Sequence, residues 1–368
     1  MGKVELGKIV TIKTGKLDAN ASSENGEFPF FTCSVNPLKI SSYSYNCECV
    51  LVAGNGDLNV KYYDGKFDAY QRTYIIESND KNILNVKYLY RFMSLYIRIL
   101  RTQTIGGVIK YIKLGNLTQA IIPLPDVESQ IKIVQILEKA ESIILNRQSQ
   151  IAALDELAQS MFLEMFGNPV LNSKNYPIEK LENIGVLNRG KSKHRPRNAS
   201  QLLGGPYPLI QTGDVANSGL YIKEFKSTYS EIGLQQSKMW PKDTLCITIA
   251  ANIAKTGILK FDACFPDSVV GFIPSTKISN IYMHYWFSFF QQILEAAAPE
   301  SAQKNINLKI LKDLKVTVPP PQLIEKFEEK VTAIIEYQEK LMEGLEKIQN
   351  LYNSLLHQAF HGELFQEE

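Results

Sequence analysis

The chain has 368 residues, of which 45% are hydrophobic, and carries 40 Lys and Arg against 38 Asp and Glu. At about 100–200 residues per domain this length predicts two or three domains, and the ordinary hydrophobic fraction excludes disordered, collagen-like and low-complexity chains. The net charge of +2 excludes a uniformly cationic nucleic-acid binder, so any such surface must be local.

Cysteine and histidine spacing predicts neither a disulfide framework nor a metal site. The five cysteines form no Cys-x-x-Cys pair, the four histidines reach no zinc signature, and the odd, scattered cysteines suggest buried thiols in a reducing cytoplasm. Residues 1–5 lack the apolar stretch of a signal peptide, and the most apolar segment, 282–298, carries charged and amide groups that exclude a membrane span. We therefore expect a cytoplasmic protein without a membrane partner.

The first part of the chain has the pattern of a mixed α/β domain. β-rich runs at residues 49–52 and 72–76 are separated by Gly, Asn and Asp turns at 54–57 and 64–65. A helix is predicted near residues 86–100, and a strand-like Ile-Ile-Pro-Leu stands at 121–124.

A long helix follows this domain. From Ile133 to Met165, apolar residues recur at alternating spacings of four and three, a mean of 3.5 that predicts a coiled-coil seam. Asp126 is the expected N-cap, and Gly167-Asn168-Pro169 is the expected stop signal.

The second half of the chain repeats this plan at a displacement of 194 residues. Lys66-Phe67-Asp68-Ala69 recurs as Lys260-Phe261-Asp262-Ala263, and Tyr88, Leu117 and Phe166 map to Tyr282, Leu311 and Phe360. The offset shrinks toward the start, where Gly15-Lys16 aligns with Gly190-Lys191 and Pro29 with Pro208. The matching runs are strands at 244–249, 268–273 and 315–318, a helix at 281–297, and a second heptad helix whose seam runs from 327 to 359.

Each long helix needs a partner along its seam. Some 40 residues at about 1.5 Å each span about 60 Å, more than the width of a small domain. Each helix could pack only on its own domain, but its repeat is the better partner. We therefore predict an α+β fold: two mixed α/β domains in a pseudo-two-fold tandem repeat, separated by two long antiparallel coiled-coil helices. The predicted segments are 1–126, 127–168, 169–319 and 320–368, in the order domain, helix, domain, helix.

The seam supplies a predicted interface for the helix pair or for further subunits. Its candidate residues are Leu137, Ile144, Ile151, Leu154, Met161, Val331, Leu341, Leu345, Ile348 and Leu355.

A cluster of cations is the best candidate for nucleic-acid contact. It lies between Asn183 and Gly213, a stretch without acidic residues, and Lys and Arg in a loop with Pro and Gly suit phosphates and guanine edges. The alternative is a solvated loop. The candidate DNA-binding residues in the second copy are Arg189, Lys191, Lys193, Arg195, Arg197, Asn252, Lys255 and Lys304; those in the first are Lys16, Asn55, Arg72 and Lys110.

The segment 185–192 also satisfies the phosphate-cradling pattern G-x-x-x-x-G-K-[ST]. That pattern works only between a buried strand and a helix N-terminus. Here polar residues precede it, and Pro196 with clustered like charges follows it. Neither copy contains a glycine-rich cofactor loop or a matched Ser/His/Asp or Cys/His set, so the sequence predicts no catalytic residue and no metal site.

Two diverged mixed α/β units, each followed by a heptad helix, with Pro-x-x-x-x-Gln at the first junction (Pro125 and Gln130), resemble the specificity subunit of a Type I restriction-modification system. The tail at 351–364, Leu-x-x-Ser-Leu-Leu-x-x-Ala-Phe-x-Gly-Glu-Leu, is also family-like. The second junction, Pro319-Pro320-Pro321-Gln322, departs from the pattern because no Gln aligns with Gln130.

The resemblance implies a non-catalytic subunit. Its globular units would be target-recognition domains that each read one half of a bipartite double-stranded DNA sequence, and its helices would set the spacing and dock two methyltransferase subunits, through which restriction subunits join. S-adenosylmethionine, ATP and Mg²⁺ would be bound by those partners and none by this chain. Three alternatives stay open: a recognition subunit of a Type IIB-like enzyme, a nucleotide-binding enzyme that uses Gly185 to Ser192, and a coiled-coil scaffold without a DNA role.

Overall fold

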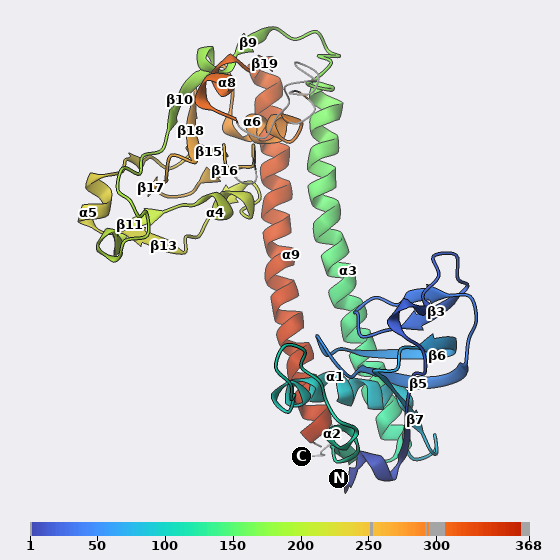
Figure 1. The fold of residues 1–368 in the computed structure, drawn as a ribbon. Coiled ribbons are helices and arrows are strands. Elements are labelled where there is room, and N and C mark those ends of the chain that lie inside the picture. The colour runs from blue at the N-terminus through green and yellow to red at the C-terminus, as the bar shows by residue number, and fades with distance from the viewer. Residues whose placement is uncertain (1, 251–252, 291–292, 294–305, 362–368) are drawn as a thin grey trace, which may run out of the picture. The chain divides into compact units, whose positions relative to one another are not determined.

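The computed structural model describes residues 2–250, 253–290, 293 and 306–361. These residues form two compact units: Met1–Ser149 with Met342–Glu368, and Gln150–Leu341. Each unit contains one globular domain and half of each of two long helices, α3 (Val127–Phe166) and α9 (Pro321–His361) (Figure 1). The two heptad helices predicted from the sequence are therefore present. The division into four segments stays a prediction.

The first globular domain is built on a six-stranded sheet in the order β2-β7-β5-β6-β3-β4. All neighbouring strands are antiparallel except β3 and β6, which are parallel. The bounds are β2 Val10–Thr14, β3 Phe28–Phe31, β4 Leu38–Ile40, β5 Tyr45–Ala53, β6 Val60–Ala69 and β7 Thr73–Ser78. The β-rich runs predicted at 49–52 and 72–76 thus lie in β5 and β7.

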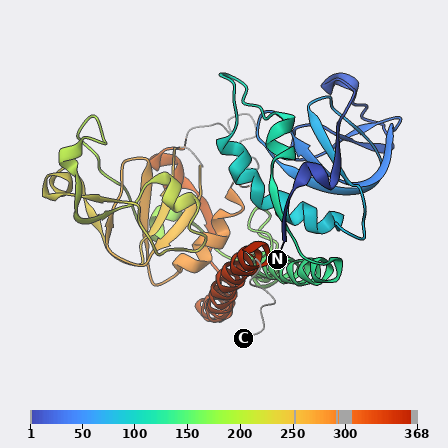
Figure 2. The same ribbon diagram turned by 90° about the horizontal axis from the view of Figure 1, so that it is seen from below.

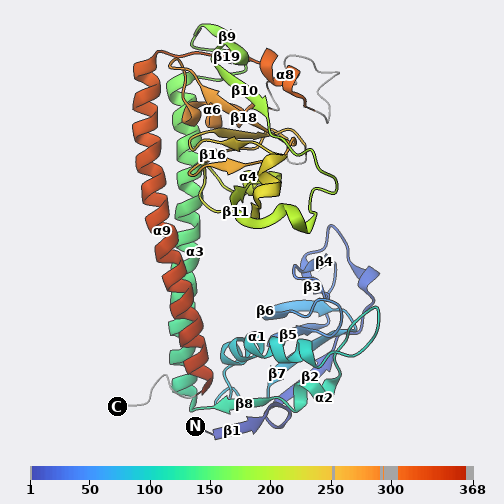
Figure 3. The ribbon, with the colours of Figure 1, turned by 90° about the vertical axis from the view of Figure 1, so that its left-hand side faces the viewer.

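Alternation along β5 gives this sheet two apolar faces. Val50 and Val52 belong to the core beneath helix α1 (Val86–Thr102), while Cys49 and Leu51 pack into a separate cluster on the other face. Figure 3 shows α1 lying across the strands. The domain is completed by a two-stranded sheet of β1 (Gly2–Glu5) and β8 (Ile121–Leu124), helix α2 (Leu114–Thr118), and 3-10 turns η1 (Leu6–Lys8) and η2 (Ala19–Ala21).

The second globular domain distributes its strands over two larger sheets and one short pair. The orders are β10-β18-β15-β16-β12, β13-β11-β17-β14 and β19-β9. The bounds are β9 Ile178–Lys180, β10 Gly185–Arg189, β11 Leu203–Leu209, β12 Tyr221–Ile222, β13 Ser227–Tyr229, β14 Met239–Trp240, β15 Leu245–Thr248, β16 Thr256–Leu259, β17 Ala263–Cys264, β18 Val269–Pro274 and β19 Lys315–Thr317. The parallel pair of the first copy recurs as β11 beside β17, with Leu209 opposite Cys264.

The helices of the second domain are short. They are α4 (Thr212–Ala216), α5 (Glu231–Gln235), α6 (Asn280–Phe287) and α8 (Leu308–Asp313), with 3-10 turns η3 (Leu181–Asn183) and η4 (Ser200–Leu202). The helix predicted at 281–297 is found as α6, which ends at Phe287; most of the remaining predicted length lies outside the described residues.

The ends of α3 follow the sequence signals. Asp126 caps the N-terminus, because its carboxylate accepts from the backbone N–H of Ser129 at 2.9 Å and from the Ser129 hydroxyl at 2.8 Å. The helix ends at Phe166, and Gly167 adopts φ +75°, a left-handed conformation that favours glycine.

In each unit the two helix halves pack antiparallel. In the first unit the Tyr352 hydroxyl of α9 donates to Glu141 of α3 at 2.7 Å, while Phe360, further along α9, packs in the same core as Leu137, which precedes Glu141 on α3. In the second unit Gln338 Nε2 donates to Asp155 Oδ1 at 2.9 Å, and the ring of Phe327 lies 5.7 Å from that of Phe162.

The same contacts anchor each domain on its helices. The Tyr88 hydroxyl donates to the Pro123 carbonyl at 2.8 Å and its ring lies 5.0 Å from Phe360. In the second unit Tyr282 donates to Thr317 at 2.9 Å and its ring lies 4.9 Å from Phe166. Every residue of one set is displaced by 194 from its counterpart. The register read from the sequence is therefore confirmed in the core.

One helical turn beyond Tyr88 and Tyr282, the contacts between domain and helices differ in polarity in the two units. Buried Arg91 of α1 forms a two-pronged ion pair with Glu141 of α3, one prong being Nη2 to Oε2 at 2.7 Å, and Tyr352 of α9 donates to the same carboxylate. The equivalent residues in the second unit are Tyr285, Ile335 and Ala158, which pack in its apolar core.

Gln130 explains why the junctions diverge. It is fully buried, accepts from the backbone N–H of Asn85 at 2.9 Å, and donates to the carbonyls of Ile83 and Pro125. Its counterpart Ile324 is also buried and apolar. The missing glutamine at the second junction is thus replaced by a hydrophobic contact.

The predicted burial of the thiols holds for three of the five free cysteines. Cys49, Cys246 and Cys264 are buried, whereas Cys33 and Cys47 are half-buried. Burial raises the pKa of the Cys47 thiol to about 11, so this thiol is protonated at neutral pH.

We predict that Glu141→Ala destabilises the first unit by about 2–3 kcal/mol, because it leaves the buried Arg91 guanidinium without its counter-charge. The matched control is Glu138→Ala, one turn earlier, which removes a half-exposed pair with Lys87 and should cost under about 1 kcal/mol. Amide hydrogen exchange of α1 peptides measures both. Equal exchange in the two variants would contradict a structural role for this ion pair.

Candidate nucleic-acid interface

The four candidate residues of the first domain lie at one end of its sheet. The registers Thr14 to Tyr74 and Ala53 to Thr73 bring the ends of β2 and β5 beside the start of β7. The loops at these strand ends carry Lys16, Asn55 and Arg72, and the loop between α1 and α2, which carries Lys110, lies against them.

Backbone hydrogen bonds hold these loops together. The N–H of Gly54 donates to the Arg72 carbonyl at 2.8 Å, and the N–H of Gly56 donates to the Lys110 carbonyl at 2.9 Å. Asn55 between them is half-buried and bridges to Tyr111. Lys16, Arg72 and Lys110 are exposed, so the structure gathers three cations at this end of the domain.

The Gly-Lys pair that occurs in both domains, at 15–16 and 190–191, is explained by a close contact between the glycine and a neighbouring backbone segment. A Cβ on Gly15 would lie 2.1 Å from the Ala69 carbonyl oxygen, and one on Gly190 would lie 2.2 Å from that of Phe265. Real Cβ atoms do not come this close, so only glycine fits at either position. Lys16 and Lys191 consequently leave equivalent points of the two domains.

The structure contradicts a phosphate-binding loop at Gly185 to Ser192. Gly185–Arg189 forms β10, which is antiparallel to β18, and Gly190 is the close-approach glycine. The next helical residues along the described chain are those of the 3-10 turn Ser200–Leu202. Because no helix N-terminus follows the glycine and lysine, the nucleotide-binding alternative fails on geometry.

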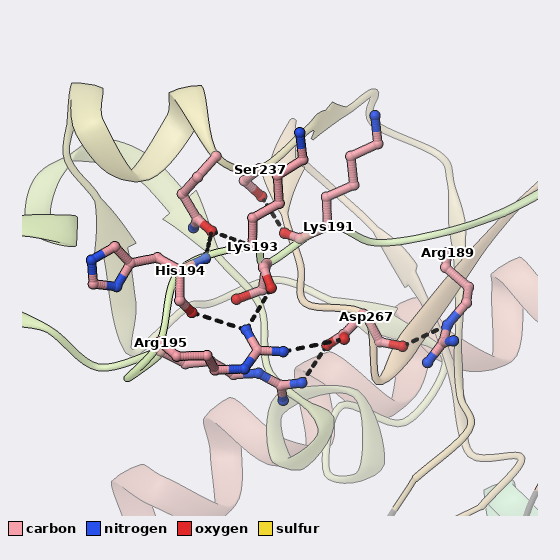
Figure 4. Close-up of polar contacts among 10 residues, drawn as sticks. Arg189, Lys191, Lys193, His194, Arg195, Ser237 and Asp267 are labelled. Carbon is pink, nitrogen blue, oxygen red and sulfur yellow. Dashed lines mark hydrogen bonds and ion pairs between the residues drawn. The ribbon is translucent and has the colours of Figure 1, made fainter.

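The cations between Arg189 and Arg197 divide into two kinds. Arg197 forms an ion pair with the Asp267 carboxylate, and Arg195 Nη2 lies 3.6 Å from Asp267 Oδ2 (Figure 4). Arg189 Nε donates to the Asp267 carbonyl at 2.9 Å. Asp267 therefore holds all three arginines in place.

Lys191 and Lys193 are free of this network. Their side chains extend away from Asp267 in Figure 4, both are exposed, and neither ammonium group has a hydrogen bond or ion pair with any residue that the structure describes. The backbone beneath them is fixed: Ser237 donates to the Lys191 carbonyl at 2.9 Å, and the N–H of Lys193 donates to Gln236 at 2.7 Å. The two lysines are thus exposed, unpaired charges among the described residues, on a hydrogen-bonded backbone.

Sequence reasoning missed Asp267 because it lies 70 residues beyond Arg197. The acid-free stretch around the arginines is real in the sequence, but the fold brings a carboxylate to it. Of the other candidates, Lys255 is exposed at the start of β16, while Asn252 and Lys304 lie outside the described residues.

A cavity of about 200 Å³ lies between this segment and β11. Its lining includes Ser192, Arg197, Asn198, Gln211 and Tyr229. The Ser192 hydroxyl is buried and has no hydrogen-bond partner among the described residues. The arginine cluster therefore borders a polar recess.

The candidate interface residues of the helices are buried in part. Leu137, Val331 and Leu341 are buried within their units and the other seven are half-buried. Other apolar residues are exposed on the helices: Ile143 and Leu351 in the first unit, Leu157 and Tyr337 in the second, at 39% to 58% exposure. These residues are related by the same displacement of 194.

The chain matches the family model described as the Type I restriction modification DNA specificity domain over residues 1–155 and 175–358. The chain belongs to this family. The resemblance seen in its repeat and junction residues is thereby confirmed.

Curated relatives carry the same description. The specificity subunit of the Type I restriction enzyme EcoDI of Escherichia coli is 27% identical over 98% of this chain and 88% of that protein. The EcoBI specificity subunit, also of Escherichia coli, is 25% identical over 86% of this chain and 74% of that protein.

Solved structures share the fold. The Type I restriction-modification S subunit from M. genitalium matches with a TM-score of 0.62 at 16% identity, over 98% of this chain and 96% of that one. A chain from a structural study of complex assembly and conformational transition in a type I restriction-modification system matches with a TM-score of 0.63 at 16% identity, over 99% and 98%. These matches confirm tandem mixed α/β domains with long helices.

No helix in the described part of the chain is both long and apolar enough to cross a membrane. Among the described residues, no group of three or more His, Cys, Asp or Glu could hold a metal ion.

We predict that Lys191→Ala with Lys193→Ala weakens DNA binding by the specificity domain and lowers the slope of log affinity against log salt by about 2, since each free ammonium replaces about one counterion. Asp267→Asn should act oppositely, because it releases Arg195 and Arg197 to phosphates. DNA affinity measured from low to moderate salt tests both.

The matched control for the lysine variant is Lys277→Ala with Lys309→Ala. It removes the same charge from exposed positions: Lys277 follows the far end of β18, and Lys309 lies on α8. An equal loss of slope in this control would show a general charge effect instead of a local contact.

Proposed function

We propose that this chain is the non-catalytic DNA-recognition subunit of a Type I restriction-modification complex, in which each globular domain reads one half of a bipartite double-stranded target. The observation that carries this proposal is the pair of unlike candidate surfaces on one repeated scaffold. Lys16 and Lys191 leave equivalent points of the two domains, yet among the described residues an arginine cluster held by an aspartate is found in the second domain and not in the first. Two such surfaces suit two different half-sites.

Phosphate contact and base reading are assigned to different residues in this proposal. Free lysines such as Lys191 and Lys193 supply sequence-independent attraction to the backbone. Arg195 and Arg197 are held in fixed orientations, and a fixed guanidinium fork is the group best suited to the N7 and O6 acceptors of guanine. This assignment is supported by Asp267, which pairs with Arg195 and Arg197 and does not pair with Lys191 or Lys193.

Catalysis and cofactors belong to other subunits in this proposal. We expect methyltransferase subunits to bring S-adenosylmethionine and restriction subunits to bring ATP and Mg²⁺, with none of these bound by this chain. The complex would act in the cytoplasm.

The methylation pattern of a host tests this function. Co-expression with the adjacent methyltransferase gene should place methyl groups on adenine at one bipartite sequence with two unlike halves, and deletion of this gene should abolish that pattern. The Lys191→Ala, Lys193→Ala variant should change occupancy through one half only. Genome-wide mapping of methylated sites measures all three. Methylation without a site preference, or an unchanged pattern after deletion, contradicts the proposal.

The exposed apolar residues of the helices are the proposed docking sites for methyltransferase subunits. The antiparallel register set by Glu141 and Tyr352 brings Ile143 of α3 to the level of Leu351 of α9. Both flank the seam, at positions that commonly set partner choice in coiled coils. In the second unit Leu157 and Tyr337 are the equivalent pair.

We predict that Ile143→Glu with Leu351→Glu reduces the complex from two methyltransferase subunits to one, because two carboxylates at an apolar contact are desolvated without partners. The control is Asn146→Glu with Ser354→Glu, which adds the same charges at exposed helix positions outside that pair. Native mass spectrometry of the co-expressed complex gives the stoichiometry. Two bound methyltransferases in the first variant would exclude this docking site.

A further inference from the structure

An unusual surface of the first domain is the loop between α1 and α2. Val108 is 103% exposed and Ile109 is 61% exposed, so two consecutive aliphatic side chains stand in solvent. Single exposed apolar residues are common, but an exposed apolar tip is typical of a contact site. Figure 2 shows the teal segment that carries them extending away from the domain.

The loop is braced at its base. Ile105 and Tyr111 exchange two backbone hydrogen bonds, at 3.0 and 2.9 Å, which close the tip Gly106 to Lys110. The N–H of Ile112 donates to the Gly54 carbonyl at 3.0 Å, and the Tyr74 hydroxyl donates to the Ile112 carbonyl at 3.2 Å. The tip is therefore held against the turn after β5 and is presented at a defined place.

The backbone of the tip is specified by glycine. Gly106 has φ +110°, and a Cβ there would lie 2.5 Å from the Ile109 carbonyl oxygen. The next two residues after Gly107 are Val108 and Ile109, whose branched side chains are stiff about χ1. The result is a tight turn that ends in a rigid apolar edge.

Positive charge surrounds this edge. The chain has no acidic residue between Asp80 and Asp126. Lys110 in the tip and Lys113 just after it are exposed, and the bonds from Gly54 and Gly56 place the loop beside Arg72. The nearby carboxylate of Asp57 is exposed and forms an ion pair with Arg101 at 3.2 Å. An apolar tip surrounded by cations is complementary to a ligand that has negative charges on its outside and apolar groups inside.

On this basis we propose that Val108 and Ile109 form a wedge that inserts between adjacent base pairs of DNA, with Lys110 and Lys113 on the flanking phosphates. Apolar side chains inserted at a base step unstack it and kink the duplex. Contact with a single thymine methyl in the groove would cover one aliphatic group and leave the other in water. The wedge rests on the proposed function, since it requires that the first domain binds DNA.

The test uses the full complex of this chain with its methyltransferase subunits and a duplex of the methylated site found by mapping. 2-Aminopurine is placed in turn at each base step of each half-site except at the methylated adenines and their neighbours, because methyltransferases flip their target base out of the stack. At the remaining steps its fluorescence rises when it is unstacked. Energy transfer between dyes at the duplex ends reports bending. The wild-type complex should raise the fluorescence at one step and shorten the end-to-end distance.

Val108→Ser with Ile109→Ser should abolish the fluorescence rise and the bend and weaken affinity about tenfold to a hundredfold, since the backbone bonds of the loop persist without the apolar edge. The control is Ile83→Ser, an exposed aliphatic residue near the junction with α3. It should behave as wild type.

The outcomes separate the wedge from the proposed function. Site-specific binding by the wild type with every probed base step stacked overturns the wedge alone, as does deformation that survives in the double variant. Loss of methyltransferase subunits in the double variant, with deformation intact, would assign the tip to a protein contact and also overturns it. Failure of the wild type to bind the mapped duplex overturns both proposals.

Discussion

The packing of each domain against both long helices is the constraint on which the rest of the structure depends. A helix of 40 residues cannot bury its apolar seam alone, and most of the stability of a helix in a protein comes from tertiary packing. The first core is therefore completed by residues far along the chain: Phe360 of α9 packs on Tyr88. Since these residues are separated by more than 250 positions, the first unit reaches its final core only after nearly the whole chain is made.

The repeat has kept some contacts and changed others. Both units retain the tyrosine that bonds a carbonyl and packs on a helix phenylalanine, because that group fixes how the first helix of the domain crosses the long ones. Around it, Tyr285 and Ile335 of the second unit stand where Arg91 and the partly exposed Glu141 form an ion pair in the first, and Tyr285 packs instead on Phe327 with ring centroids 5.3 Å apart. A buried ion pair must be made in one geometry, whereas an aromatic contact tolerates small adjustments. The first domain is thus the more strictly oriented on its helices.

Features with a local or periodic signal could be predicted from the sequence. The heptad spacing, the Asp126 cap, the Gly167 stop and the register of 194 residues all depend on near neighbours or on regular spacing, and the structure contains each of them. Features created by distant residues could not be predicted. Asp267 reaches the arginines across 70 positions, and Arg72 meets Lys110 only through the bonds of Gly54 and Gly56. The exposure of Ile143 and Leu351 could not be predicted, because an apolar spacing of 3.5 residues identifies the seam but does not identify which flanking positions remain exposed to solvent.

The near-neutral charge follows from this arrangement. The Asp267 carboxylate offsets one of the two positive charges of Arg195 and Arg197, so this pair of arginines attracts arbitrary DNA less than two unpaired arginines would. Such an arginine can leave the Asp267 carboxylate for a base only where the base offers hydrogen-bond acceptors in an equally favourable geometry. Where the base does not, the arginine stays paired with Asp267. Free lysines then supply attraction while held arginines supply discrimination, since specificity is a difference of affinities. In the proposed function the overall charge can stay small because recognition depends on where each cation is fixed.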